Sequence, residues 1–410
     1  MLHEHDLKLE DVVGATTDGA TVMKTFGSAT LIRNRVDLLD PQPLVCTCMV
    51  ITVMDFLSMD IWRIYKTLLG LTPLMLIIPW YFKRTNPINQ LHVVDCNPGV
   101  GCEYPEGVDL RIIVLTYNRA ASLRKLLQSL ESLKLDGNTA SLEIWIDRKA
   151  GKKNGKRVTG SEDTVHNETL KTAQAFSWSL GQTRVHVQKE HVGIYGQWID
   201  TWRPRPGTNE LALFLEDDLS VSPYAYRWLR AVHEKYGSRN DIAGYTLQGE
   251  GVANANNRRP INRPKIETVL LFKLLGSWGY APHPKSWMKF QDWYHDVKRD
   301  ANFHPYVPKA TTITGWYKMF ERQNRQDTMW TIWHVYYCDK YNMFTVYANI
   351  QAVTKNSNII LAANRNEPGL HQGHKGPERT NKILKSWSDD YVRLPDLPVR
   401  YDWDGTVLTD

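Results

Sequence analysis

Short apolar runs that alternate with amphipathic stretches constrain the fold of this chain most strongly. Residues 108–115 are rich in β-branched side chains and lead into a polar turn at 116–119. In residues 120–133, leucines recur with the spacing i, i+3, i+4, i+7, which places them on one face of a helix. Further strands are expected at 142–146, 185–187 and 210–215, and a further helix at 168–180. This alternation predicts an α/β protein with a doubly wound, mostly parallel sheet and helices on both faces.

Composition excludes several other classes of protein. The 410 residues are 42% hydrophobic and 23% charged, so the chain can bury a core and is not expected to be disordered. Its 50 Lys and Arg against 44 Asp and Glu leave a net charge of only +6, which argues against nucleic-acid binding through bulk charge. Five cysteines are too few for a disulfide scaffold, and a mean hydropathy of −0.42 excludes a polytopic membrane protein.

The N-terminal part of the chain divides into a mobile tail at 1–42 and a hydrophobic region at 43–84. Residues 67–82 carry no charge, have basic residues on both sides and contain Trp80 and Tyr81 near their end, which is typical of a membrane anchor. The run is shorter than the ~20 residues that a spanning helix needs, and it contains two prolines. We expect a membrane anchor here, with a hydrophobic arm packed on the folded body as the alternative.

The rest of the chain divides into three parts. Residues 85–106 contain several prolines and glycines and are expected to form a stem. If this part lies in an oxidising compartment, Cys96 and Cys102 can pair within the stem. A folded domain is expected at 107–380 and an extended C-terminal strap at 381–410.

Polar side chains follow three of the expected strands at the point where each strand ends. Residues 116–119 follow the first strand, Asp147 the second and the acids 216–218 the fourth. Ligands of an open parallel sheet bind beyond the carboxyl ends of its strands, so these residues are expected to share one rim. Three successive carboxylates cannot be buried unpaired, and Mg²⁺ or Mn²⁺ is their natural partner. The alternative is a solvated acidic turn, or the start of a helix at Pro223.

Two segments resemble the GT-A glycosyltransferases, which transfer a sugar from a nucleotide-sugar donor. Residues 112–119 are similar to the start of the inverting enzymes known as glycosyltransferase family two. Residues 215–223 are similar to the EDDLxVxP segment of N-acetylglucosaminyltransferase I, which holds the acidic metal-binding motif often written DxD. The resemblance covers about residues 108–375. It implies a GT-A fold and an inverting hexosyl- or N-acetylhexosaminyltransferase that acts on a hydroxyl acceptor such as a glycan.

The resemblance also assigns residues to a nucleotide-sugar pocket, and the expected donor is a UDP-sugar. The residues implied in this pocket are Thr116, Tyr117, Arg119, Asp147, Gly193, Gly196, Glu216 and Asp217. Asp147 would contact the base or ribose, and the two glycines would let the backbone approach the nucleotide closely. Asp218 would coordinate Mn²⁺ or Mg²⁺ with Glu216, and His371 would complete the shell. For His371, a surface histidine in a glycine-rich loop is the alternative.

Three tryptophans lie in segments that resemble the acceptor side of these enzymes. Trp278 is in a GxGW-like segment, and Trp330 and Trp333 are in a segment similar to the family's WDDW motif. We expect them to face a sugar ring, whereas a core tryptophan at a tight turn is the alternative for Trp278. In the WDDW motif the first aspartate is the general base. Thr331 occupies its place here, and its hydroxyl cannot serve as a base near neutral pH.

Other residues are therefore candidates for the general base. Asp327 lies four residues before Thr331, so on a helix the two would share a face, and we favour this aspartate. His334 titrates in the required range. Glu250 follows another expected strand and is a third candidate.

Together these features predict a metal-dependent inverting glycosyltransferase. The anchor predicts a single-pass type II protein of the Golgi or ER membrane with a lumenal catalytic domain, and a soluble cytoplasmic protein is the alternative. Because Thr331 replaces the expected base, a non-catalytic glycan- or nucleotide-binding protein of the same fold is one alternative function. A sugar nucleotidyltransferase is another. Nucleic acid is not an expected partner.

Overall fold

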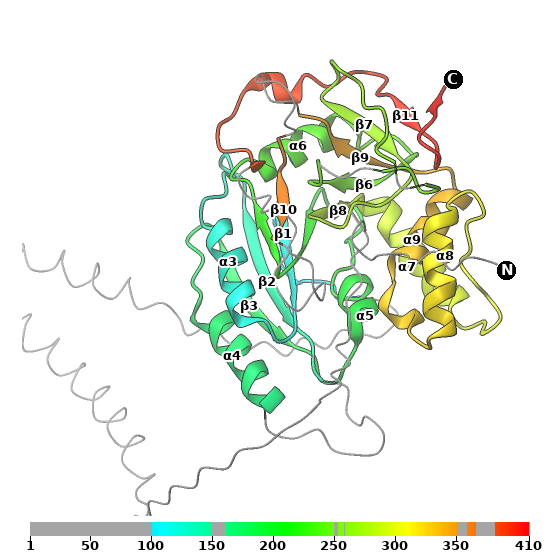
Figure 1. Ribbon diagram of the computed structural model, residues 1–410. Coiled ribbons are helices and arrows are strands. Elements are labelled where there is room, and N and C mark those ends of the chain that lie inside the picture. Colours follow the sequence, from blue (N-terminus) through cyan, green and yellow to red (C-terminus); the bar gives the residue numbers. More distant parts are fainter. Residues whose placement is uncertain are drawn as a thin grey trace, which may run out of the picture. The chain divides into compact units, whose positions relative to one another are not determined.

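A large mixed sheet with helices packed on it forms the structure (Figure 1). The computed structural model describes residues 101–149, 161–249, 253–257, 259–350, 359–365 and 382–409. The strands are β1 Leu110–Thr116, β2 Ala140–Ile146, β3 Gln182–Val187, β4 Leu211–Glu216, β5 Leu219–Val221, β6 Ile242–Thr246, β7 Val269–Phe272, β8 Tyr280–Pro282, β9 Phe344–Ala348, β10 Ala362–Asn364, β11 Arg400–Tyr401 and β12 Val407–Leu408. The helices are α3 Ala120–Leu130, α4 Ser161–Ala175, α5 Gly193–Ile199, α6 Ala225–Tyr236, α7 Pro284–Val297, α8 Thr311–Arg322 and α9 Thr331–Lys340, with short 3-10 helices η3 Gln326–Thr328 and η5 Asp389–Val392.

Within the described residues, ten strands form the main sheet in the order β12-β11-β7-β9-β6-β8-β4-β1-β2-β3. One half, from β3 through β2 and β1 to β4, is entirely parallel. β8 then runs antiparallel to both β4 and β6, and β7 runs antiparallel to β9, whereas β6 and β9 are parallel. The prediction of a mostly parallel α/β sheet is therefore confirmed, with antiparallel strands in its second half.

Local sequence accounts for the first strand and helix. All seven residues of β1 are buried, as expected for a strand covered on both faces. The amphipathic face of α3 is the leucine face that the spacing predicts, and it includes Leu123, Leu126 and Leu127. The expected helix at 168–180 is displaced, because α4 starts earlier and ends at Ala175. Beyond it, the indole of Trp178 donates to the Leu130 carbonyl at 3.0 Å, which holds this part of the chain against the end of α3.

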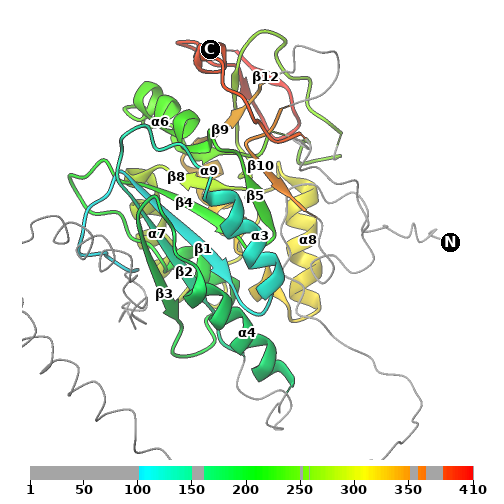
Figure 2. The same cartoon turned by 90° about the vertical axis from the view of Figure 1, so that its left-hand side faces the viewer.

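Alternate residues of β1 point into two different cores, so helices cover both faces of the sheet (Figure 2). Ile112 and Val114 pack in one core with side chains of α3 and α6. Ile113 and Leu115 pack in the other core with side chains of α5, α7, α8 and α9. This alternation between two buried cores confirms the prediction of helices on both faces.

The ends of the folded region differ from the predicted boundaries. Tyr104 is only 4% exposed and packs in the same core as α5, so this part of the expected stem belongs to the folded body. The expected C-terminal strap contributes β11 and β12 to the edge of the main sheet. Cys102 is disulfide-bonded, but its expected partner Cys96 lies outside the described residues.

The predicted tail at 1–42 and the predicted anchor at 43–84 also lie outside the described residues. In the part of the chain that the structure describes, no helix is both long and apolar enough to cross a membrane.

A small second sheet positions the acidic residues after β4. β5 follows these acids, and it pairs antiparallel with β10, so that Ser220 lies opposite Ala363 and Leu219 opposite Asn364. The segment 216–223 therefore does not run directly into a helix at Pro223, since α6 begins at Ala225 after the strand β5.

Candidate active site

The carboxyl ends of β1, β2 and β4 bring the predicted polar residues to one edge of the sheet. In the parallel register, Thr116 of β1 lies opposite Ile146 of β2. Leu115 lies opposite Glu216, the last residue of β4. Thr116, Asp147 and the three acids that end β4 therefore share this edge, as the sequence predicts. The three acids, residues 216–218, are at most 3% exposed.

The middle acid, Asp217, is bound by its neighbours on all sides. Its Oδ2 accepts a hydrogen bond from the hydroxyl of Thr116 at 2.6 Å, and its Oδ1 pairs with the guanidinium of Arg119. Its backbone carbonyl accepts from the hydroxyl of Ser122 at 2.9 Å. Through these contacts Asp217 holds the loop after β1 against the end of β4. The hydroxyl of Thr116 and the guanidinium of Arg119 are both bound to Asp217 as a result.

The last acid, Asp218, differs from Asp217 in one respect. It is only 1% exposed, and its Oδ2 accepts from the side-chain amide of Asn364 at 2.5 Å. Among the described residues, its Oδ1 is buried and has no hydrogen-bond partner. An uncompensated carboxylate oxygen in the interior is costly, so this atom is the one that most needs a cation.

Arg365 fixes the backbone around this aspartate. Its backbone N–H donates to the carbonyl of Asp218 at 3.1 Å. Its guanidinium donates to the carbonyls of Ser122 and Asp217, both at 2.9 Å. Sequence reasoning missed both Arg365 and Asn364. The available signal was an apolar run at 359–363 that ends in polar residues, the same pattern that marks the end of β4.

The first acid, Glu216, is tied to the aromatic core. Its Oε1 accepts from the indole N–H of Trp198 at 3.0 Å, and Trp198 stacks on Trp330 with ring centroids 4.5 Å apart. Trp330 is fully buried, so its ring has no face open to a sugar. The ring packs against Trp198 of α5 and Trp287 of α7, and its expected contact with an acceptor remains a prediction.

Trp278 and Trp333 are also buried, at 5% and 8% exposure. Trp278 belongs to the core beneath α3 and α6. A tryptophan in the core was the alternative to an acceptor contact for this residue. Trp333 packs edge-on against Tyr294 and lies 5.6 Å from the ring of Phe303. Neither ring presents an open face in this structure, so their expected contact with an acceptor remains a prediction.

Asp147 holds the start of α5 next to this edge. Its carboxylate accepts from the backbone N–H groups of Val192 and Gly193, each at 3.0 Å, and lies 3.1 Å from the imidazole Nδ1 of His191. Burial raises the pKa of Asp147, although these hydrogen bonds act in the opposite direction. The carboxylate of Asp147 is thus bound by other groups of the protein. Its expected contact with a base or ribose remains a prediction.

The two glycines at the start of α5 have different physical roles. Gly193 has a φ of 64°, which favours glycine, and its N–H points to Asp147. At Gly196 a Cβ atom would lie 2.6 Å from the Cβ of Val192, so that glycine is needed for packing within the helix. Close approach to a nucleotide is therefore not needed to explain Gly196.

Tyr117 lies at the same edge, beside a residue that sequence reasoning did not select. Its ring centroid is 6.4 Å from that of His166, which comes from α4. His166 Nε2 lies 3.0 Å from the carbonyl of Asp147. No sequence signal marks His166, since only the packing of α4 against β2 places it there.

The favoured base, Asp327, does not share a helix with Thr331. Asp327 is exposed in η3, and the chain leaves helical geometry at Met329, with φ −129° and ψ 69°, before α9 starts. The expectation that the two residues share a helical face is therefore wrong. η3 nevertheless packs on α5, because the hydroxyl of Tyr195 donates to the carbonyls of Gln326 and Met329 at 2.7 and 2.9 Å. This contact brings Asp327 next to α5. The same helix carries Gly193, which bonds Asp147, and Trp198, which bonds Glu216.

The second candidate base, His334, lies in the aromatic core. It is 1% exposed, its Nε2 lies 3.3 Å from the hydroxyl of Tyr280, and its ring packs edge-on against Phe290. Burial lowers its pKa to about 3, so the imidazole is neutral at physiological pH. A base needs access to the hydroxyl that it deprotonates, and this buried position argues against His334. Glu250, the third candidate, lies outside the described residues.

One carboxylate oxygen, Oδ1 of Asp218, is available at this edge to a divalent cation. Among the described residues, no three His, Cys, Asp or Glu side chains converge as a metal-ligand cluster, and His371 lies outside them. Mg²⁺ and Mn²⁺ prefer oxygen ligands, and Mg²⁺ in particular is commonly held by one or two carboxylates plus substrate phosphates. The unpartnered Oδ1 of Asp218 is a ligand of that kind.

No protein-family model and no curated protein matches the sequence. Among solved structures, the chain is similar to a mannosyltransferase from Pyrobaculum calidifontis in complex with GDP-Man and Mn²⁺, with 15% identity and a TM-score of 0.22, over 45% of this chain and 44% of that chain. It is also similar to TarS of S. aureus, with 14% identity and a TM-score of 0.22, over 39% of this chain and 24% of that chain. The chain thus spans less than half the length of either structure. Structural similarities with TM-scores this low do not support a functional assignment. The function has to be inferred from the residues of the chain itself.

Proposed function

We propose that this chain is a metal-dependent inverting glycosyltransferase of the GT-A type, which transfers a sugar from a nucleotide sugar to a hydroxyl acceptor such as a glycan. The observation that carries the proposal is the buried, unpartnered Oδ1 of Asp218 at the carboxyl edge of a parallel sheet. The resemblance of residues 112–119 and 215–223 to motifs of those enzymes supports it. We take the donor to be a UDP-sugar, and the transferred group a hexose or N-acetylhexosamine.

In this proposal Asp218 holds Mn²⁺ or Mg²⁺, while Asn364 keeps its carboxylate in place and Arg365 keeps its backbone in place. The bound ion would neutralise the negative charge that develops on the leaving diphosphate. Asp217 contributes indirectly, since it orients Thr116 and Arg119 at the end of β1. Tyr117 and the loop before α5 form the adjoining wall, where a nucleotide would lie.

We further propose Asp327 as the general base, because it is exposed and η3 packs on α5 beside the acidic edge. An acceptor hydroxyl must lose its proton as it attacks the anomeric carbon, and a carboxylate within reach can accept that proton. An Asp327→Asn variant is expected to lose transfer while it keeps its affinity for UDP. A variant that transfers sugar at the rate of the unmodified protein would exclude Asp327 as the base.

A non-catalytic nucleotide- or glycan-binding protein is the second candidate function. The specific observation in its favour is Thr331, which is 7% exposed at the start of α9 where the resemblance expects a catalytic aspartate. Binding of UDP with Mn²⁺, without sugar transfer to any acceptor and without donor hydrolysis, would favour this candidate.

The location of the protein is a separate proposal. We propose that the anchor lies in residues 43–84 and that the catalytic domain is lumenal in the Golgi or ER. The disulfide at Cys102 supports this, because disulfides persist in oxidising compartments and are rare in the cytosol. Protection of the folded domain from added protease in sealed microsomes would agree with it, whereas digestion without detergent would contradict it.

A donor screen tests the activity most directly. UDP- and GDP-sugars are incubated with the protein and Mn²⁺, and release of the nucleoside diphosphate is measured. We expect release from one donor, lost on chelation and reduced by more than about a hundredfold in Asp218→Asn. Asp296→Asn is the matched control, since the Asp296 side chain is 80% exposed, and it should leave the rate unchanged. Consumption of a nucleoside triphosphate together with a sugar phosphate would instead indicate a nucleotidyltransferase.

A further inference from the structure

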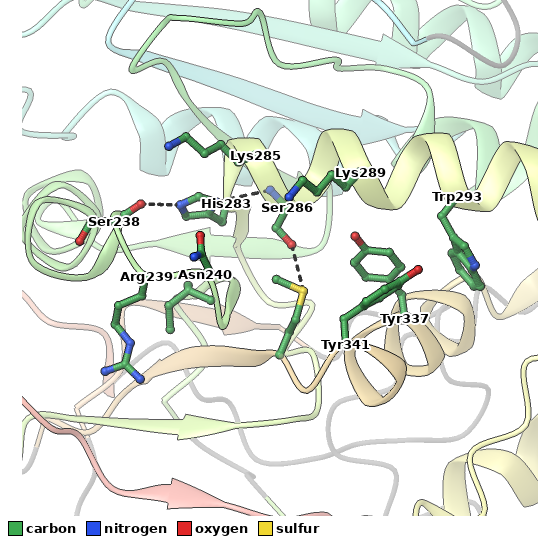
Figure 3. A pocket seen from close by; sticks show the side chains of 13 residues that line it. Ser238, Arg239, Asn240, His283, Lys285, Ser286, Lys289, Trp293, Tyr337 and Tyr341 are labelled. Atoms are coloured by element: carbon green, nitrogen blue, oxygen red, sulfur yellow. Dashed lines mark hydrogen bonds between the residues drawn. The ribbon is translucent and has the colours of Figure 1, made fainter.

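A cavity lies at the end of the strands opposite to the acids. It is lined by the loop that precedes β6, by α7 and by the end of α9, and it has a volume of about 440 Å³ (Figure 3). The strands β4, β6 and β9 run in the same direction, and the cavity lies where β6 and β9 begin, whereas the acids lie where β4 ends. It is therefore separate from the candidate active site.

The charge of this cavity is positive. Lys285 and Lys289 are exposed and one helical turn apart on α7, and both line the cavity. In the described part of the chain neither lysine forms an ion pair. Arg239 also lines the cavity, but it is paired with Asp241 through hydrogen bonds of 2.9 and 2.7 Å. No Asp or Glu is among the described residues that line it, so the two lysine charges are left uncompensated.

Aromatic rings form another wall. Tyr341 is 49% exposed, although large apolar rings are normally covered, and its ring lies 4.6 Å from that of Tyr337. Figure 3 shows these two rings side by side, with Trp293 beyond them on α7. Lys340 Nζ lies 5.4 Å from the centroid of the Tyr341 ring and covers part of it, and the part that stays exposed can pack against the apolar C–H face of a sugar. A simple inorganic anion would gain nothing from such a contact.

Two polar side chains complete the lining. Ser238 and Asn240 are exposed in the loop before β6 and line the cavity. They offer a hydroxyl and an amide, which are the groups that bind sugar hydroxyls. A volume of about 440 Å³ falls within the ~300–1,000 Å³ of small-molecule sites.

We propose that this cavity binds an anionic saccharide, that is, a short glycan that carries a sulfate or a carboxylate group. Lys285 and Lys289 bind the anionic group, and Tyr341 packs against a sugar ring. Binding here does not depend on the proposed transferase activity, because the cavity shares no residue with the acidic edge.

Calorimetric titration of the full chain with four probes tests the proposal. The probes are 3′-sulfated lactose, 3′-sialyllactose, lactose and inorganic sulfate. At least one of the two anionic lactoses is expected to bind about tenfold or more tightly than either lactose or inorganic sulfate. Only an anionic lactose can bind both the lysines, through its anionic group, and the rings, through its sugar. The tighter of the two identifies the anionic group.

Variants locate this binding. The double variant Lys285→Gln with Lys289→Gln should weaken the anionic probe about tenfold or more, and Tyr341→Ala should weaken it as well. Lys134→Gln removes an exposed charge outside the cavity and is the matched control, with unchanged affinity expected. The proposal is wrong if the double variant binds like the control. It is also wrong if inorganic sulfate binds as tightly as the anionic lactoses, or if these bind no better than lactose.

Discussion

The two ends of the same parallel strands hold buried charge in opposite ways. At the amino ends, Arg111 of β1 is fully buried, and its guanidinium bonds Glu210 at 2.8 and 2.9 Å and Glu143 of β2 at 2.7 Å. Glu143, in the middle of β2, also bonds His186 near the carboxyl end of β3 at 2.7 Å, so the network that starts at the amino end of β1 extends along the neighbouring strands. At the carboxyl ends, Asp218 keeps one buried oxygen without a partner among the described residues.

The two ends therefore differ in how completely their buried charges are compensated. The amino-end network is closed, because each of its charges has an opposite charge within hydrogen-bonding distance. Burial alone would raise the pKa of Glu143, yet the hydrogen bond and charge of His186, together with Ser141 and Arg111, hold it below its usual range. The carboxyl-end acids have no such compensation at Asp218. Breaking the closed network is therefore expected to cost stability, whereas the open oxygen of Asp218 is the position that we propose for a metal ion.

The largest expected effect on stability is at the amino ends. Replacing Arg111 in an Arg111→Met variant leaves Glu143 and Glu210 buried without their main partner. We expect a loss of about 3–5 kcal/mol in the free energy of unfolding, measured by urea denaturation. Arg299→Met is the control, because the Arg299 side chain is 77% exposed, and its effect should stay within about 0.5 kcal/mol. If Arg111→Met lowers the free energy of unfolding by less than about 1 kcal/mol, the charges at the amino ends do not form the stabilising network that distinguishes them from the carboxyl ends.

A smaller effect is expected for Arg365, which holds the acidic turn. An Arg365→Met variant removes charge-assisted hydrogen bonds to the carbonyls of Ser122 and Asp217, and we expect a loss of about 2 kcal/mol in the free energy of unfolding. Because the same contacts position Asp218, Mn²⁺-dependent UDP binding should weaken too. Loss of stability with unchanged UDP binding would show that Arg365 supports the fold alone.

The smallest effect is a pH dependence of opposite sign at the two ends. Glu143 has a lowered pKa, so its contribution to stability is present above about pH 4.5 and is lost as the pH falls through its folded-state pKa. Asp147 has a raised pKa, so the folded state gains stability as the pH falls through that pKa toward about 3.8. Each contributes at most about 1.4 kcal/mol per pH unit.

Unfolding free energies between pH 6 and pH 3.5 measure both contributions. The difference between the unmodified protein and Glu143→Gln should shrink as the pH falls. For Asp147→Asn, the unmodified protein should gain relative to the variant over the same range. If the two differences in unfolding free energy change in the same direction as the pH falls, the direction of the pKa shift is wrong for either Glu143 or Asp147.

Local patterns explain how much of the fold the sequence predicts. β1 is rich in β-branched and apolar residues and α3 has a clear period of 3.6 residues, and the positions of both are confirmed. In the second half of the sheet only the strand before Glu250 was expected, which is β6. The place of β8 was not predicted, because this strand is three residues long and its position between β4 and β6 depends on distant pairing. The order of the strands is therefore a tertiary property.

The candidate site shows the same division. The acids that end β4 could be selected because carboxylates after a buried strand are unusual on physical grounds. Asn364 and Arg365 also follow an apolar run, but that pattern does not indicate that they reach Asp218, because this contact depends on the pairing of β10 with β5. The break at Met329 was equally hidden, because nothing in its neighbouring residues marks the end of a helix there. Burial of Trp330 likewise depends on its stacking with Trp198.

Binding of UDP with and without Mn²⁺ decides whether Asp218 holds a metal ion. UDP affinity is measured by calorimetry for the unmodified protein and for Asp218→Asn, together with the free energy of unfolding of both. We predict that Mn²⁺ tightens UDP binding about tenfold or more in the unmodified protein and not in the variant, whose stability is equal or higher. An equal effect of Mn²⁺ on both proteins, or no effect on either, would show that Asp218 does not hold the ion.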